Sequence, residues 1–444
     1  MPPPMRPMRA GIRRRSATMG PKTTMRRSAN RLPSMCPMAS PPGGHVRRFG
    51  AIGHLGRVVG RRGARFGASE GGTMRPSWIE VDLDAVEANA AKIAERVAPA
   101  ALWAVVKADA YGHGDVPVAE AALAGGARCL AVALVEEGVR LREAGLRVPI
   151  LLLSEPPLDA AEEVVEWELV PTVYRRDFAE RLGKAALEAR RRLGVHLKLD
   201  TGMHRVGAAP ADAVPLARFV VEHPGLRLEG VWTHFPVSET DPDYTRRQVT
   251  ALVRFRDALR AEGIEVPLLH AANTAGALAV PESRLDAVRV GLGLYGLRPA
   301  PGIAPELELA PAMRVVSRVA YVRRLPRGAR PSYGRIRPLP RAATIATVPI
   351  GYADGMPRRL AAAGGEVLIG GRRRPLAGMV TMDQIVVDVG DDDVQVGDEV
   401  VLLGRQGTEE ITADEWAMRL GTINYEIVTG FGPRLPRRHL RRDG

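Results

Sequence analysis

Eight short apolar runs alternate with helix-like segments in the middle of this 444-residue chain. The runs cover residues 102–106, 129–134, 149–153, 169–174, 195–199, 228–233, 268–272 and 287–294. Between them lie segments such as residues 135–144, whose apolar positions recur at helical spacing. Eight strands that alternate with helices are the pattern of a TIM (β/α)8 barrel, which typically needs ~250 residues. We therefore predict an α/β fold in which residues 74–310 form such a barrel.

After Pro311 the pattern becomes mostly β. Apolar or alternating runs lie between Gly and Pro turns at residues 313–322, 343–350, 366–369 and 384–389. These runs predict a second, mostly β domain over residues 311–444. One helix is well marked there, because Thr412 and Glu415 have the spacing of a capping box and Gly421 is expected to end the helix after Leu420.

The first 73 residues differ from the rest in charge. They contain 15 of the chain's 63 lysines and arginines but a single acidic residue, Glu70, so their net charge is +14. The other 48 basic and 49 acidic residues nearly cancel. This Pro-, Met-, Arg- and Gly-rich segment is predicted to be disordered. A transit peptide and a nucleic-acid-binding tail both share this composition, but we favour a misassigned start, because residues 74–82 begin like a complete protein.

The cysteine content and the hydropathy of the sequence indicate in which cellular compartment the protein is expected. Cys36 and Cys129 lie on opposite sides of residue 73, which gives no disulfide framework and fits a reducing environment. No apolar run approaches the ~18 residues of a membrane span. We therefore expect a cytoplasmic protein that does not bind a membrane.

A lone lysine, Lys107, directly follows the first apolar run and precedes Tyr111 and two glycines. The carboxyl ends of barrel strands are where such folds carry their chemistry. A lysine desolvated there can lose its proton and form a Schiff base with a carbonyl cofactor. On its own, however, Lys107 is equally well explained as a strand-end lysine that reaches out to solvent.

Other polar side chains follow the later runs, where a barrel would bring them to the same edge. They are Arg205 after the fifth run, His234 after the sixth, Asn273 and Thr274 after the seventh, and Arg289 on the eighth. Each signal alone is weak, since a single histidine is more often structural. The threonine and the glycines of the last two runs match the place where barrels commonly bind phosphate. We predict no metal site.

Residues 105–114 resemble the lysine motif that binds pyridoxal 5'-phosphate (PLP) in alanine racemases. Further matching strings follow in the same order, at residues 198–207, 332–334, 350–355, 382–384 and 422–426. The resemblance runs from about Trp78 to about Arg434 and is highly specific. It implies a PLP-dependent enzyme that interconverts L-alanine and D-alanine and supplies D-alanine for peptidoglycan.

The resemblance also implies two bases on opposite faces of the substrate. Lys107 would carry the cofactor and act as one base, and Tyr333 would be the other. Family members are homodimers, so Tyr333 would be donated in trans by the partner subunit. The substrate contacts would be Arg205 and Met382.

The remaining roles concern the cofactor. The phosphate would be held by Tyr111, Thr274, Tyr425 and the backbone of Gly291 and Leu292, with Asn273 beside it. Arg205 would contact the phenolic oxygen, His234 would flank the ring and Arg289 would meet the pyridine nitrogen. Lys198 can be carbamylated in this family, which would make it an anionic partner for Arg205.

Several alternatives remain. A serine racemase or a racemase of broad specificity would share the fold. PLP-dependent decarboxylases are less compatible, because they typically place a carboxylate at the ring nitrogen and a cysteine on the second face, where this chain has Arg289 and Tyr333. A non-catalytic, single-barrel PLP protein would lack the β domain. A nucleic-acid-binding regulator would need its charge outside the first 73 residues.

Overall fold

The computed structural model describes residues 75–441. The predicted disordered segment, residues 1–73, lies outside these residues, as do Met74 and the last three residues of the chain.

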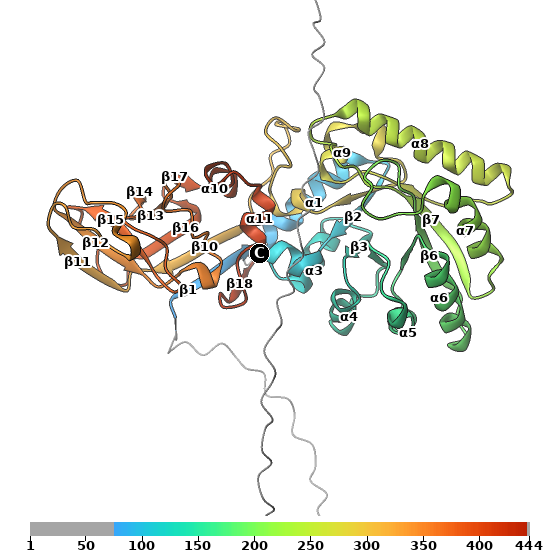
Figure 1. Ribbon diagram of the computed structural model, residues 1–444, viewed down its shortest axis with the longest axis horizontal. Coiled ribbons are helices and arrows are strands. Elements are labelled where there is room, and N and C mark those ends of the chain that lie inside the picture. Colours follow the sequence, from blue (N-terminus) through green and yellow to red (C-terminus); the bar gives the residue numbers. More distant parts are fainter. Residues whose placement is uncertain (1–74, 442–444) are drawn as a thin grey trace, which may run out of the picture. The chain divides into compact units, whose positions relative to one another are not determined.

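Eight parallel strands form the predicted barrel (Figure 1). They are β2 (Ala101–Val105), β3 (Cys129–Val132), β4 (Ile150–Leu152), β5 (Thr172–Val173), β6 (Leu193–Lys198), β7 (Leu226–Trp232), β8 (Leu269–His270) and β9 (Ala287–Val290). Their order in the sheet is β4-β3-β2-β9-β8-β7-β6-β5. The ring closes just before β5, where the Leu152 amide donates to the Val170 carbonyl at 2.9 Å. Each predicted run overlaps one of these strands, so the barrel prediction is confirmed.

Helices cover the outside of the barrel (Figure 1). They are α1 (Leu83–Val97), α3 (Asp115–Ala124), α4 (Val135–Glu143), α5 (Ala161–Glu166), α6 (Arg176–Glu188), α7 (Pro210–Glu222), α8 (Pro242–Ala261) and α9 (Thr274–Ala279). The short segment α2 (Lys107–Gly112) lies instead at the carboxyl end of β2. The predicted helix at 135–144 is α4. In α6 the buried residues Phe178, Leu182 and Ala185 recur at helical spacing and form the stripe that packs on the strands.

The part of the described chain after Pro311 is mostly β, as predicted. Its strands are β10 (Met313–Arg318), β11 (Tyr321–Leu325), β12 (Ala343–Val348), β13 (Glu366–Ile369), β14 (Arg372–Pro375), β15 (Ile385–Gly390), β16 (Glu399–Gln406), β17 (Glu409–Ile411) and β18 (Arg437–Leu440). Two helices follow β17, α10 (Ala413–Leu420) and α11 (Asn424–Thr429). The predicted start and end of α10 are confirmed, since Thr412 Oγ1 accepts from the Glu415 amide at 3.0 Å and Gly421 has a φ of 69°. The Glu415 carboxylate, however, binds Arg373 at 2.9 Å rather than completing a capping box.

The predicted run at residues 313–322 contains parts of two strands. The chain changes sheets in the middle of it, with β10 in the sheet β14-β13-β16-β10-β1-β18, in which β1 is Ser77–Asp82, and β11 in the sheet β11-β12-β15. Val319 donates its amide to the Asp398 carbonyl, whereas the next amide, that of Ala320, goes to Thr347. Both strands mix apolar residues with arginines, so hydropathy alone does not show the crossing.

The first described strand, β1 (Ser77–Asp82), belongs to the sheet of β10. It pairs antiparallel with β10 and parallel with β18. Its last residue, Asp82, then caps α1 by accepting from the Ala85 amide at 2.9 Å. The sequence pattern did not predict that a strand before the barrel joins the later sheet.

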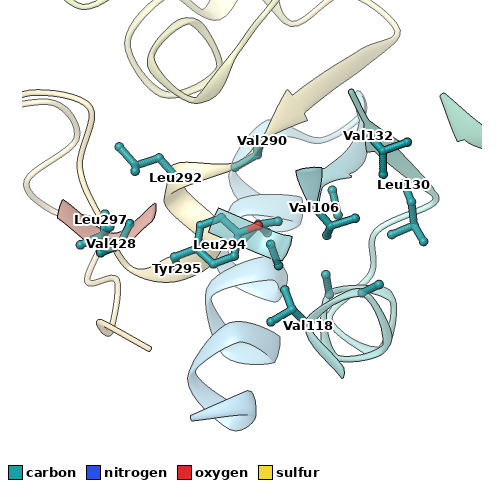
Figure 2. Packing of buried hydrophobic residues seen from close by; sticks show 14 of the residues in the cluster. Val106, Val118, Leu130, Val132, Val290, Leu292, Leu294, Tyr295, Leu297 and Val428 are labelled. Atoms are coloured by element: carbon teal, nitrogen blue, oxygen red, sulfur yellow. The ribbon is translucent and has the colours of Figure 1, made fainter. Parts of the chain in front are cut away.

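An apolar cluster underlies the strand ends that carry the candidate site (Figure 2). Val106, Leu130 and Val290 continue or belong to neighbouring barrel strands, and Tyr295 lies in the turn η3 (Leu292–Tyr295). Val428 of α11 reaches the same cluster. Burial of such side chains stabilises the fold by about 1.5–3 kcal/mol each. The strand ends are therefore supported by well-packed apolar side chains.

Candidate active site

Lys107 lies two residues beyond the end of β2, at the start of an unusual turn. The four residues that follow it, Ala108–Tyr111, have φ values of 53°, 53°, 50° and 55°. Such left-handed backbone costs L-residues about 1–2 kcal/mol each, so the surroundings must hold it. The Ala110 amide donates to the Val106 carbonyl at 2.9 Å, and the Ala110 side chain is fully buried.

Glu137 of α4 holds the beginning of this turn. Its carboxylate is buried and accepts three backbone N–H groups, from Ala108 at 2.6 Å, Ala133 at 2.8 Å and Leu134 at 3.1 Å. These groups lie after β2 and after β3, so one carboxylate joins two neighbouring strand ends. No sequence signal identified Glu137 beyond its place in the first turn of a predicted helix.

Replacing Glu137 with glutamine should destabilise the protein. The amide NH₂ of glutamine would face backbone donors, and hydrogen bonds to charged groups contribute about 1.5–3 kcal/mol each. We expect a loss of about 2–4 kcal/mol in the free energy of unfolding, measured by urea titration. Glu136→Gln, at the exposed neighbouring position, is the matched control and should stay within about 0.5 kcal/mol of wild type. Equal stabilities of the two variants would contradict the role of Glu137.

A cavity of about 350 Å³ opens at these strand ends. A volume above about 300 Å³ is typical of small-molecule sites. All ten residues predicted to bind a cofactor line it: Lys107, Tyr111, Arg205, His234, Asn273, Thr274, Arg289, Gly291, Leu292 and Tyr425. Lys198 and Trp232 line it as well. Trp232 was not predicted from the sequence, although it lies within an apolar run and ends β7.

Tyr333 and Met382 are not among the residues that line this cavity. Tyr333 is 74% exposed and Met382 is 53% exposed. Tyr333 lies in the turn η4 (Tyr333–Arg335), which Ser332 fixes by donating its hydroxyl to the Met379 carbonyl at 2.7 Å. The described chain therefore brings one of the two predicted bases to the cavity and leaves the other exposed.

Hydroxyl groups gather at one part of the cavity. Tyr111, Thr274 and Tyr425 contribute them, and the Gly291 amide donates to Thr274 Oγ1 at 3.3 Å. A Cβ atom at Gly291 would lie 2.6 Å from Tyr111 Oη, so only glycine fits there. Burial raises the pKa of Tyr111 and raises that of Tyr425 to about 12. Both phenols therefore remain hydrogen-bond donors at neutral pH, as an anionic ligand requires.

The cavity is positively charged. Lys107, Lys198, Arg205 and Arg289 all line it, and within residues 75–441 no aspartate or glutamate does. Burial lowers the pKa of Lys107, and nearby Arg205 lowers it further, whereas Glu137 opposes the shift. Burial, followed by Arg289 and Arg205, lowers the pKa of Lys198 to about 7. The cavity therefore favours anionic groups and keeps part of its amines neutral.

Replacing Lys198 with methionine should remove a pH dependence of stability. Folded Lys198 has a pKa of about 7, against an ordinary value of 10.5. Between these pH values the folded chain binds fewer protons than the unfolded chain, so this group makes wild-type stability rise with pH. Relative to Lys198→Met, the wild-type free energy of unfolding should rise between pH 7 and pH 9 by at most about 1.4 kcal/mol per pH unit. Urea unfolding in CO₂-free buffer at each pH measures this free energy. The control is Lys184→Met, on the exposed face of α6, whose free energy of unfolding should change with pH as that of wild type does.

Arg289 is buried and fixed from several sides. It donates to His270 Nδ1 at 2.7 Å and to the carbonyls of Thr233 at 2.7 Å and Ala271 at 2.8 Å. Its guanidinium carbon lies 4.4 Å from the centroid of the Trp232 ring. Burial lowers the pKa of Arg289 to about 9, which leaves it a cation at neutral pH. Arg289 is therefore a donor in the cavity that does not accept a proton.

Asn273 and His234 have clear local contacts. Asn273 Oδ1 accepts from the Gly276 amide and from Ser238 Oγ, both at 2.9 Å, so its side chain caps α9 beside Thr274. His234 Nδ1 lies 3.5 Å from Arg289 Nη2. Burial and then Arg289 lower the pKa of His234 well below its usual range, so its ring is neutral.

Comparison with known proteins gives one family over most of the described chain. The family model for the N-terminal domain of alanine racemase matches residues 81–299, and the model for the C-terminal domain matches residues 312–439. The alanine racemase of Symbiobacterium thermophilum is 46% identical over 366 residues, which are 82% of this chain and 97% of that protein.

Solved structures agree. The alanine racemase of a D-cycloserine-producing Streptomyces lavendulae superposes with a TM-score of 0.79 at 38% identity, over 84% of this chain and 98% of that one. A histidine racemase from Leuconostoc mesenteroides is also similar, with a TM-score of 0.77 at 28% identity, over 83% of this chain and 99% of that one. With both domain models matched in order and relatives above 40% identity over most of its length, this chain belongs to the alanine racemase family.

Proposed function

We propose that this protein interconverts L-alanine and D-alanine with PLP as cofactor, using Lys107 and Tyr333 as its two bases. The observation that carries the proposal is the cavity at the barrel strand ends, which collects Lys107 and every residue predicted to bind the cofactor. Membership of the alanine racemase family supports the same activity. The product would be D-alanine for peptidoglycan.

The donors around the cavity fit PLP. The hydroxyls of Tyr111, Thr274 and Tyr425 suit a phosphate, and Arg289 suits a ring nitrogen that accepts a hydrogen bond. Lys107 supplies the amine that a carbonyl cofactor needs. When bound, PLP delocalises the negative charge left on the α-carbon after its proton is removed. The protein then only has to hold the substrate and move one proton.

Lys107 and Tyr333 would move that proton on opposite faces of the α-carbon. The lowered pKa of Lys107 increases the neutral fraction that accepts a proton. Arg289 stays protonated, so it would donate to the ring nitrogen without transferring its proton. Arg205, exposed at the cavity, would bind the substrate carboxylate. Lys198 has a pKa of about 7, and its neutral amine can react with CO₂ to form a carbamate that pairs with Arg205.

Assays of the purified protein with PLP and L-alanine, L-serine, L-lysine or L-histidine test the proposal. We expect L-alanine to be racemised fastest, and D-alanine is measured by chiral chromatography. Serine or broad-specificity racemases are the alternative, and the similar histidine racemase justifies the fourth substrate. Release of CO₂ without racemisation would instead indicate a decarboxylase, which the absence of a carboxylate among the described cavity residues disfavours.

Replacing Arg289 with glutamate should slow racemisation by about 10²-fold, the typical cost of losing one preorganised donor. A carboxylate would favour a protonated ring nitrogen, so transamination should become a larger share of the turnover. Pyruvate and D-alanine formation are measured together. Arg284→Glu, on a half-buried arginine near α9, is the control, and an unchanged product ratio in Arg289→Glu would remove Arg289 from the ring nitrogen.

The exposure of Tyr333 supports a homodimer in which each subunit lends this residue to the other's cavity. A chain whose own cavity holds Lys107 but not Tyr333 needs a second subunit to complete it. Among the described residues no helix is long and apolar enough to cross a membrane. The cytoplasmic location stays a prediction.

A further inference from the structure

Two histidines lie one behind the other beneath Arg289, inside the barrel. His270 is the last residue of β8 and is fully buried, and His196 of β6 is 5% exposed. Arg289 Nη1 lies 2.7 Å from His270 Nδ1, and His270 Nε2 lies 2.9 Å from His196 Nδ1. The three side chains therefore form one hydrogen-bonded chain that starts at the cavity and leads away from it.

The chemistry of the groups fixes the direction of every bond. A guanidinium only donates, so His270 Nδ1 must accept and carries no proton. A neutral His270 then bears its proton on Nε2 and donates it to His196 Nδ1. Burial and then Arg289 hold the pKa of both rings far below the usual range, that of His196 at about 3. Both histidines are thus neutral at working pH, with unprotonated Nδ1 atoms.

The barrel interior is shaped around His196. Gly230 of β7 faces it, and a Cβ atom there would lie 2.5 Å from His196 Nδ1. The register between β6 and β7 shifts between Val195 and His196. Trp103 contacts both histidines, with ring centroids 5.7 Å from His196 and 4.6 Å from His270. The absence of a side chain at Gly230 leaves room for the His196 ring, and the irregular register of β6 and the indole of Trp103 fix where the ring lies.

Arg289 depends on this support because it is a buried cation held by neutral acceptors. Within residues 75–441 it makes no ion pair with a carboxylate. Among the described residues its partners are two backbone carbonyls, His270 at 2.7 Å and His234 at 3.5 Å, so His270 is the nearer of its two side-chain acceptors. A partner that accepts the distal N–H of an imidazole orients the ring and raises its basicity, as is known for histidines that bind metals.

We infer that His196 is a positioning residue for Arg289: by accepting the Nε2 proton of His270, it keeps His270 Nδ1 available to the guanidinium and fixes the direction in which Arg289 faces the cavity. This inference rests on the proposed function for its effect on turnover, since Arg289 is proposed to meet the cofactor's ring nitrogen. The hydrogen-bonded chain itself is independent of that function.

Three variants of the PLP-loaded protein test the inference. His196→Leu removes the acceptor, whereas His196→Asn keeps one, because Asn Oδ1 can take the position of His Nδ1. Val195→Ala, at the fully buried neighbouring position, is the control for a loss of packing in the same strand. The readouts are ¹⁵N NMR of labelled histidines, the visible absorption band of the bound cofactor, and kcat and KM for alanine.

We expect wild-type His270 and His196 to give the ¹⁵N shifts of neutral rings with an unprotonated Nδ1. His196→Leu should lose the hydrogen-bonded N–H signal of His270, shift the cofactor band and lower kcat by roughly five- to tenfold, the factor that one net hydrogen bond represents, with KM changed less. In His196→Asn the N–H signal of His270, the position of the cofactor band and kcat should all be close to their wild-type values. Val195→Ala should lower thermal stability without moving the N–H signal or the band.

Three results would overturn the inference: a wild-type His270 with its proton on Nδ1, a His196→Asn variant as impaired as His196→Leu, or a His196→Leu variant that matches Val195→Ala in both spectra. If the wild-type protein does not racemise alanine, the proposed function fails. The NMR signals of the histidine chain still decide whether His196 holds His270.

Discussion

Lys107→Ala is expected to lower racemisation by more than about 10³-fold, because the same amine would both hold the cofactor and move the proton. Lys184→Ala, on the exposed face of α6, should keep wild-type activity. The cavity holds a second buried amine, that of Lys198, whose pKa of about 7 also leaves much of it neutral. The assignment of the covalent amine therefore needs a direct experiment.

Borohydride reduction followed by peptide mapping identifies the lysine that binds the cofactor covalently. The pyridoxyl group should be fixed on Lys107, which follows β2 and is held by the turn that Glu137 clamps. A label on Lys198 would exchange the roles of the two lysines. A protein that is not labelled at all would remove the covalent cofactor from the proposal.

Tyr333→Phe should also be nearly inactive, with a loss of about 10²–10⁴-fold if Tyr333 is the second base. Tyr321→Phe, another exposed tyrosine of the β sheets, is the control and should be active. Because Tyr333 does not line the cavity of its own chain, we expect it to act across a two-fold dimer, in which the two composite sites are equivalent.

Mixing Lys107→Ala chains with Tyr333→Phe chains distinguishes the two arrangements. If Tyr333 acts in trans, each mixed dimer has one site with both bases and one with neither, so random pairing should restore about a quarter of wild-type activity. If it acts within its own chain, every site lacks one base and no activity returns. Mass spectrometry must confirm that mixed dimers have formed, and confirmed mixed dimers without activity would exclude a shared site.

The barrel was predictable because each parallel strand is buried on both faces and therefore appears as a continuous apolar run. The crossing from β10 to β11 was not predictable, since the hydropathy of residues 313–322 does not change where the chain passes from one sheet to the other. β14 was missed for the opposite reason, because three of its four residues are arginines. Local sequence indicates which residues are buried, but the β10–β11 crossing and β14 depend on which strands they pair with.

The same distinction applies to the site. Lys107, Arg205 and His234 follow apolar runs, so topology brings them to one edge of the barrel and the sequence predicts them. The supporting residues act through contacts distant in the chain: Glu137 lies 29 residues from Ala108, and His196 lies 74 residues from His270. Four left-handed residues after Lys107 were also unpredictable, because their own propensities oppose that backbone.

The position of β1 between β10 and β18 has a consequence for synthesis on the ribosome. Ser77 must wait for Ser317, 240 residues later, and Ile79 pairs with Arg437 near the end of the described chain. The barrel strands β2 and β3 pair with β3 and β4, which are made soon after them, so these three strands can assemble while translation continues. Until β10 emerges, however, β1 is an apolar edge without a partner. The nascent chain therefore leaves β1 without its sheet partners until β10 has been made, and the sheet is complete only when β18 leaves the ribosome.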